Sequence, residues 1–215
     1  MVEELNLTLQ SSNEYSNKTW IFTTCYTENS PYEIEARNLR RSCRKVKAPL
    51  QVFSMPSLGD WLKNIRATNL IIARALKQTK KNIVWIDSDA RVFQYPDLFD
   101  IFKSDIGLYM PKVRKGHNYW TEYATGTMFF KNNERVRLFW DDYCEQVKDM
   151  DIPAQAFLGG LLIKSKSIKL SPLPYNYCYI ADPVPAHGLL ETSKIVILQR
   201  KGMKRYAKSG FRSVI

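Results

Sequence analysis

The chain has 215 residues, of which 45% are hydrophobic and 25% are charged. This composition is that of an ordinary globular protein and excludes disordered, collagenous and coiled-coil chains. A chain of this length can bury roughly 70% of its unfolded surface, so a large core is possible without metals or disulfides. The 32 Lys and Arg residues exceed the 21 Asp and Glu residues by 11, which favours an anionic partner such as nucleic acid, an acidic membrane or a phosphorylated small molecule.

Two segments supply much of the excess positive charge. Residues 36–47 and residues 200–215 each hold six Lys or Arg side chains and no acid. Such runs commonly form a solvated surface, although either could also face an anion. The four cysteines show no Cys-x-x-Cys spacing, so we expect reduced, mostly buried thiols and neither a zinc knuckle nor a redox pair.

Residues 1–19 form a polar leader that lacks the basic start and apolar middle of a signal peptide. No stretch reaches the roughly 18 apolar residues that a membrane span needs. We therefore expect a cytoplasmic or otherwise soluble protein with no transmembrane segment. One folded domain is expected over residues 20–215, either as the whole protein or as part of a longer chain with further domains.

Strand and helix patterns alternate through the first half of the chain. Residues 20–26 are aromatic and β-branched, and residues 32–46 carry apolar side chains at helical spacing. A short strand over 50–53 and a helix over 61–78 lead to the continuous apolar run at 83–86, which is typical of a parallel strand covered on both faces. This order predicts right-handed crossovers and a doubly wound sheet.

The second half is less regular and predicts a smaller mixed region. We expect the polar segment 112–120 to be a loop. The fold class expected is therefore α/β, a single-domain, Rossmann-like fold with a mostly parallel central sheet flanked by helices. The remaining predicted elements are strands over 106–110 and 125–130, helices over 133–147 and 153–163, and short strands around 177–180 and 194–198.

Two carboxylates follow the central apolar strand. Asp87-Ser88-Asp89 comes directly after that strand, so it lies at the carboxyl edge of a parallel sheet, where open α/β sheets bind their ligands. A turn beginning at Asp87 would bring both carboxylates to one side. Such oxygen ligands suit Mg²⁺ or Mn²⁺, which takes one or two protein carboxylates and leaves its other positions to water and substrate phosphates. The same pattern would also arise if the carboxylates merely capped a turn.

The segment NIVWIDSDARVFQYPDLF resembles the Asp-x-Asp region of GT-A fold glycosyltransferases, the nucleotide-diphospho-sugar transferases. Residues 20–27 resemble the first strand of that fold, GDWLKNIRATNLIIARAL resembles the helix before the motif strand, and residues 123–132 with the helix after them resemble the elements that follow it. The resemblance covers residues 20–165. It implies transfer of a sugar from a nucleotide-diphosphate donor, usually a UDP-sugar, to a hydroxyl of a glycan, glycoprotein or other acceptor.

The resemblance also implies a metal site. Asp89 would bind Mn²⁺ or Mg²⁺ directly, and Asp87 would touch the ribose or sugar of the donor as well as the metal shell. Many relatives supply a third ligand, often His, from late in the chain; here this would be His187 or, in another alignment, Gln199. The cation would neutralise charge that grows on the diphosphate leaving group.

The nucleotide base is expected at the end of the first strand, where the ring of Tyr26 can stack on it and Thr24 can read its edge. Arg66 on the second predicted helix could reach a phosphate or the ribose. The further expected donor contacts are Ser88 and Gly126 and, against the diphosphate, Arg200 and Lys201.

The sequence departs from the family pattern at the catalytic step. Many relatives carry an Asp-Gln pair before a helix, whereas residues 153–155 read Pro-Ala-Gln. Asp151, just upstream, is the first candidate for the base that takes the acceptor proton, ahead of Glu122, Asp142 and Asp182. If no base lies near the reactive carbon, a retaining mechanism is favoured, so the stereochemical outcome stays open.

Two other functions are compatible with parts of the sequence. Haloacid-dehalogenase-like phosphatases also carry Asp-x-Asp after a strand, but their motif continues with Thr or Val where this chain has Arg91, and it normally follows the first strand. A nucleic-acid-binding module would explain the net charge. No zinc-finger, RNA-recognition or helix-turn-helix signature supports that alternative.

Overall fold

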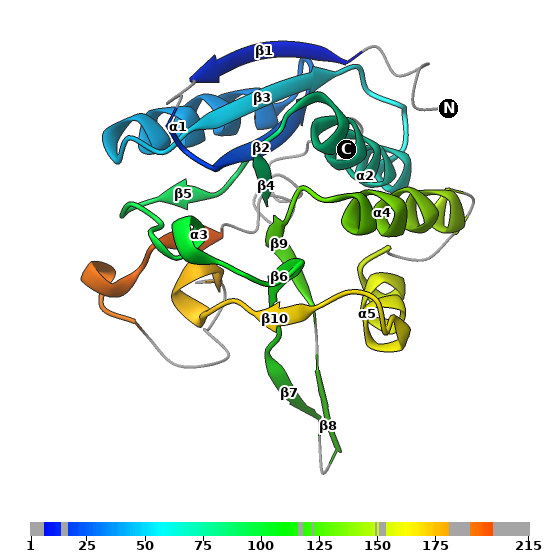
Figure 1. The fold of residues 1–215 in the computed structure, drawn as a ribbon. Helices are drawn as coiled ribbons and strands as arrows, with labels where there is room; N and C mark the ends of the chain where they lie inside the picture. The colour runs from blue at the N-terminus through cyan, green and yellow to red at the C-terminus, as the bar shows by residue number, and fades with distance from the viewer. Residues whose placement is uncertain are drawn as a thin grey trace.

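The computed structural model of the protein describes residues 7–13, 17–115, 118–121, 123–148, 150, 154–180 and 190–199. A seven-stranded mixed sheet forms the centre, in the order β1-β3-β2-β4-β9-β6-β10 (Figure 1). Five strands run in one direction, and β1 and β9 oppose them. The strands are β1 (Thr8–Asn13), β2 (Trp20–Thr27), β3 (Leu50–Met55), β4 (Asn82–Ile86), β6 (Ile106–Tyr109), β9 (Ala124–Phe130) and β10 (Leu170–Pro172).

The first half folds as the sequence predicts. Helices α1 (Pro31–Lys45) and α2 (Trp61–Gln78) connect β2 to β3 and β3 to β4, and these strands pair in parallel. Each helix begins at a side-chain cap, because Ser30 Oγ accepts the Tyr32 N–H at 3.3 Å and Asp60 Oδ1 accepts the Lys63 N–H at 3.0 Å. The carboxyl ends of β2 and β4 therefore meet at one edge of the sheet.

Part of the expected polar leader belongs to the sheet. Strand β1 pairs antiparallel with β3, with Thr8 opposite Ser54 and Asn13 opposite Leu50. Segment 112–120, expected to be a loop, also contains strands: β7 (Lys112–Lys115) and β8 (Asn118–Thr121) form an antiparallel hairpin that extends from the sheet (Figure 1). Both β1 and the β7–β8 hairpin are held by backbone hydrogen bonds between strands. Neither segment has the alternating apolar pattern that would predict a strand.

Helices cover the two faces of the sheet (Figure 1). Helices α2, α4 (Glu134–Val147) and α5 (Ala154–Lys164) pack on one face, around the buried Trp140 and Phe130. Helix α1 and the short α3 (Leu98–Ile101) pack on the other, around Phe22 and Phe129. A second, three-stranded sheet has the order β11-β12-β5. The smaller elements are β5 (Arg91–Val92), η1 (Tyr175–Tyr177), β11 (Tyr179–Ile180), η2 (Thr192–Lys194) and β12 (Ile197–Gln199).

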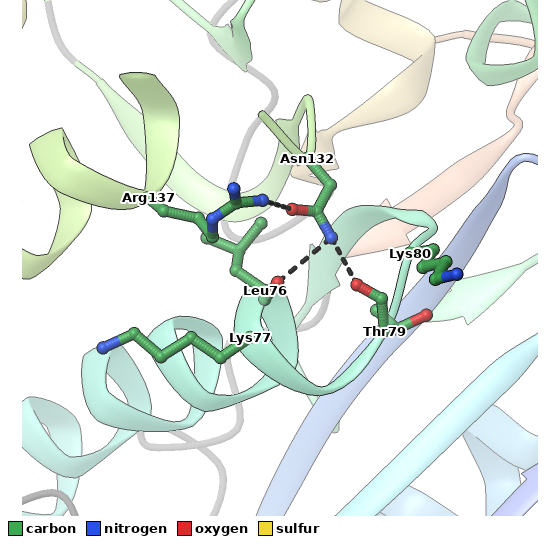
Figure 2. A pocket seen from close by; sticks show the side chains of 6 residues that line it. All are labelled: Leu76, Lys77, Thr79, Lys80, Asn132 and Arg137. Carbon is green, nitrogen blue, oxygen red and sulfur yellow. Dashed lines mark hydrogen bonds between the residues drawn. The ribbon is translucent and has the colours of Figure 1, made fainter. Parts of the chain in front are cut away.

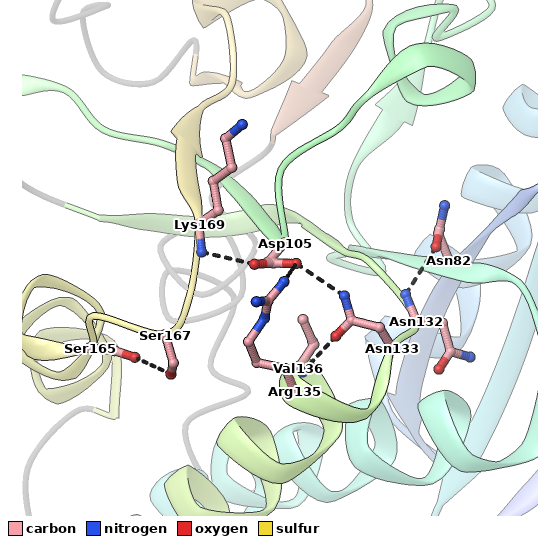
Figure 3. Close-up of polar contacts among 9 residues, drawn as sticks. All are labelled: Asn82, Asp105, Asn132, Asn133, Arg135, Val136, Ser165, Ser167 and Lys169. Atoms are coloured by element: carbon pink, nitrogen blue, oxygen red, sulfur yellow. Dashed lines mark hydrogen bonds and ion pairs between the residues drawn. The ribbon is translucent and has the colours of Figure 1, made fainter.

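A buried carboxylate joins three elements of the second half (Figure 3). Asp105, 2% exposed, precedes β6, and its Oδ1 accepts hydrogen bonds from Asn133 Nδ2 at 3.0 Å and Arg135 Nη2 at 3.1 Å. Its Oδ2 accepts the Lys169 N–H at 2.9 Å. Burial opposes ionisation, but these donors together hold the pKa of Asp105 below its usual 3.8. The start of α4 and the approach to β10 are thereby fixed to β6.

All four cysteines are buried free thiols, as expected. In the part of the chain that the structure describes, no helix is long and apolar enough to cross a membrane.

Candidate active site

The acidic motif forms a tight turn at the carboxyl end of β4. The Asp87 N–H donates to the Gly126 carbonyl at 3.0 Å, and the Ala90 N–H returns to the Asp87 carbonyl at 3.0 Å. Ser88 and Asp89 are 8% and 6% exposed, and Asp87 is half-buried. The turn brings the two carboxylates close enough that the charge of one raises the pKa of the other.

Burial, followed by the negative charge of Asp89, raises the pKa of Asp87 to about 7. One hydrogen bond opposes this shift, because Trp85 Nε1 donates to Asp87 Oδ1 at 3.1 Å. Two cysteine side chains face the same carboxylate: burial and the Asp87 charge raise the pKa of Cys25, and they raise that of Cys178 to about 12. Two acids in a partly enclosed site favour a positively charged ligand.

A side chain from the second sheet reaches this turn. Gln199, 6% exposed at the end of β12, donates from Nε2 to the Gly126 carbonyl at 2.8 Å and to Thr127 Oγ1 at 2.6 Å. Its Oε1 is buried and has no hydrogen-bond partner among the residues that the structure describes. A Cβ built on Gly126 would lie 3.0 Å from Gln199 Oε1 and 3.2 Å from Asp87 Oδ2. The absence of a side chain at Gly126 therefore lets the Gln199 amide and the Asp87 carboxylate pack closely against β9, where a Cβ would collide with them.

An ion pair links the acidic turn to helix α1. Arg91 follows the motif, and its guanidinium pairs with the Glu35 carboxylate of α1 while Nη1 donates to the Ala90 carbonyl at 2.6 Å. Strand β5 carries Arg91 and pairs antiparallel with β12, with Leu198 opposite Arg91. The paired strands β5 and β12 thus hold the acidic turn and Gln199 next to each other.

The two residues that we expected to contact the nucleotide base lie near the carboxyl end of β2, the strand beside β4. Thr24 is fully buried, and within the described part of the chain its Oγ1 has no hydrogen-bond partner. Tyr26 is half-buried and packs against the apolar residues on the α1 side. Burial and then the charges of Glu33 and Glu28 raise the pKa of Tyr26. Arg66 lies half-buried on α2.

The structure thus brings Asp87, Asp89 and Gly126 together and places Thr24 and Tyr26 on the adjacent strand. The expected base Asp151, the expected third metal ligand His187, and the expected diphosphate contacts Arg200 and Lys201 lie outside the described residues. Within the described ranges, no group of three His, Cys, Asp or Glu side chains gathers as a metal site. The oxygen donors that do converge are the two carboxylates and the amide of Gln199. The sequence indicated Gln199 only through an alternative alignment.

A pocket of about 400 Å³ lies at the opposite end of β4 (Figure 2). It is lined by Leu76, Lys77, Thr79, Lys80, Asn132 and Arg137. Lys77 and Lys80 extend in opposite directions (Figure 2). Lys77 Nζ pairs with Asp141 at 2.8 Å. Because β4 rises about 3.3 Å per residue, roughly 15 Å separate this pocket from Asp87. The pocket is therefore not part of the acidic site.

No family model and no curated protein matches this sequence. Solved structures do match its fold. A glycosyltransferase involved in the glycosylation of the major capsid of PBCV-1 superposes with a TM-score of 0.61 at 12% identity, covering 91% of this chain and 100% of that one. Mouse xyloside xylosyltransferase 1 (TM-score 0.52, 11% identity, 86% and 98% covered) and an active-site mutant of LgtC (0.51, 10%, 88% and 95%) are also similar. This chain therefore has the fold of the GT-A glycosyltransferases.

Proposed function

We propose that the protein is a metal-dependent glycosyltransferase that moves a sugar from a nucleotide-diphosphate donor, a UDP-sugar, to a hydroxyl of a glycan, glycoprotein or other acceptor. The observation that carries the proposal is the pair Asp87 and Asp89 at the carboxyl end of the central strand. The fold shared with solved glycosyltransferases supports it. So does the position of the site, since α/β sheets of this kind bind ligands at that edge.

A divalent cation fits the residues that are present. Asp87 and Asp89 provide hard oxygen donors, and a third oxygen close to Asp87 is Gln199 Oε1, which is buried and has no hydrogen-bond partner among the described residues. Mn²⁺ or Mg²⁺ is the class of ion that such a set prefers. When bound, the ion would stabilise the negative charge that develops on the diphosphate as the glycosyl bond breaks.

The residues of the chain have separate roles in this proposal. Asp89 holds the cation, and Asp87 contacts both the cation and the donor's ribose or sugar. Thr24 and Tyr26 border the place expected for the base. Arg66 lies on the helix that precedes the motif strand and contacts the ribose or a phosphate. Asp151 remains the proposed proton acceptor, and Arg200 and Lys201 remain the proposed partners of the diphosphate oxygens.

The proposal is tested by calorimetric titration of UDP, UDP-glucose, UDP-galactose and UDP-N-acetylglucosamine with and without Mn²⁺. We expect at least one of these ligands to bind only when Mn²⁺ is present. Asp89→Asn should weaken that binding about 100-fold or more, because removing one partner of a buried charge pair costs about 3–5 kcal/mol.

Glu145→Gln is the matched control, because Glu145 is an exposed carboxylate on α4 that pairs with Lys148 at 2.7 Å. It should bind donor as the parent does. Donor binding that ignores both Mn²⁺ and the Asp89 exchange would refute the proposal. Metal-dependent hydrolysis of simple phosphate esters with no affinity for nucleotide sugars would favour a phosphatase, and salt-sensitive retention of DNA or RNA would favour a nucleic-acid-binding module.

A further inference from the structure

Helix α1 carries a row of positive side chains along its solvent side. Side chains three, four and seven positions apart share one face of an α-helix. The buried residues Ala36, Leu39 and Cys43 define the face of α1 that packs on the sheet. The opposite face carries four exposed cations, which we call the α1 basic stripe: Arg37, Arg41, Arg44 and Lys45. Because the buried face fixes the helix against the sheet, the stripe is a preformed surface.

No acid of the described chain neutralises the α1 basic stripe. Two pairs of its residues lie four positions apart, and like charges at this spacing destabilise a helix. Other exposed cations pair with acids, as Lys77 does with Asp141, but none of the ion pairs among the described residues includes a member of the stripe. Of the two acids on α1, Glu35 is buried and pairs with Arg91, and Glu33 is half-buried in the first turn. An external anionic surface would relieve the repulsion within the stripe.

Two large apolar side chains are exposed beside these cations. Ile34 lies three positions before Arg37, so it shares the face of the stripe, and it is 56% exposed. Phe93, 45% exposed, follows Val92, whose N–H donates to Ser42 Oγ on α1 at 3.1 Å. Duplex nucleic acid would offer phosphates to such a surface but no apolar layer. The interface of an anionic bilayer offers both.

We propose that the α1 basic stripe docks this protein on an anionic phospholipid bilayer, with Ile34 and Phe93 in the interfacial layer. A guanidinium can donate two parallel hydrogen bonds to one phosphate, so arginine suits lipid headgroups. A helix that lies along the bilayer surface brings its whole outer face to the headgroups at once. Helix α1 begins just after β2, whose carboxyl end lies at the same sheet edge as the acidic turn, so docking would keep that edge near the bilayer. The inference goes beyond the proposed function and does not depend on it.

The experiment measures co-sedimentation of the full chain with vesicles of phosphatidylcholine, alone or with about 30% phosphatidylserine. We expect binding to the anionic vesicles only, weakening as salt is added. Replacing Arg37, Arg41 and Arg44 together by glutamine should lower the vesicle partition coefficient about 100-fold, since each Lys or Arg near an anionic bilayer contributes about fivefold. Replacing the same three residues by lysine should leave it within about threefold of the parent, because the bilayer attracts the charge itself.

Lys131→Gln, Lys164→Gln and Lys166→Gln combined form the matched control, because these exposed lysines lie outside α1 and form no ion pair among the described residues. The control should bind anionic vesicles within about threefold of the parent. Ile34→Ser should weaken binding about fivefold or more, because one apolar side chain no longer enters the bilayer interface.

Thermal melting shows which variants are folded, and Arg41→Gln alone, with an expected loss of about fivefold, decides the question if the triple glutamine variant is not. The inference is overturned if the parent binds neutral and anionic vesicles alike, or if the folded glutamine variant stays within about threefold of the parent. Equal losses in the stripe variant and the lysine control would also overturn it, because net charge and not the stripe would then govern binding. Retention of duplex DNA without any binding to vesicles would assign the stripe to nucleic acid instead.

Discussion

Replacing Glu35 and Arg91 by methionine tests how much their ion pair, which lies next to the acidic turn, contributes to stability. The two side chains are 15% and 7% exposed. Glu35→Met would leave the guanidinium buried with the carbonyl oxygens of Ala90 and residue 35 as its partners, at 2.6 and 3.4 Å. An uncompensated buried charge costs about 3–5 kcal/mol. At roughly 2–4 °C per kcal/mol for a protein of this size, Tm should fall by about 6–20 °C.

Removing both charges should cost much less. Glu35→Met combined with Arg91→Met replaces the pair by apolar side chains of similar length, and we expect a loss below about 2 kcal/mol. Chemical denaturation of the parent, both single variants and the double variant would give the coupling energy of the pair. The reasoning is refuted if the double variant is destabilised by as much as the sum of the two single exchanges, because the two charges would then act independently.

Three further exchanges test the packing around the sheet. Asp105→Asn should cost about 1–3 kcal/mol at pH 7, because one buried donor loses its acceptor. Its folded-state pKa lies below 3.8, so the stability that Asp105 contributes is complete above pH 3.8 and is lost as the pH falls through the lowered pKa. The unfolding free energies of parent and variant should therefore converge as the pH falls below 3.8, and parallel curves would contradict this. Asn132→Ala removes the amide that donates to the Leu76, Thr79 and Lys81 carbonyls at 3.0, 2.6 and 3.1 Å, so hydrogen exchange at the end of α2 should accelerate, whereas unchanged protection would count against this cap. Gly107→Ala would place its Cβ 2.5 Å from Phe102 Cζ and should lower Tm by an overpacking cost of about 1–3 kcal/mol, which Phe102→Leu should partly restore; a cost that Phe102→Leu leaves unchanged would locate the strain elsewhere.

Local sequence patterns determined the first half of the fold and the position of the acidic motif. The apolar run before Asp87 and the helical spacing of the two preceding segments are properties of neighbouring residues, and they predict a buried strand that follows two crossover helices. The resemblance to GT-A glycosyltransferases came from the same segments, and the solved structures confirm the fold. The sequence also placed the four cysteines in the core, because nothing in their spacing suggested another role.

Only the tertiary structure decided which distant residues share the site. Strand β1 and the β7–β8 hairpin depend on backbone pairing, which leaves little trace in side-chain periodicity. Gln199 reaches Asp87 because β12 pairs with β5 across more than a hundred residues of chain, and the sequence offered His187 as an equal alternative. The orientation of the Gln199 amide is set by the Gly126 carbonyl of a third strand. Such contacts depend on how separate elements pack against one another, so a pattern of neighbouring residues does not contain them.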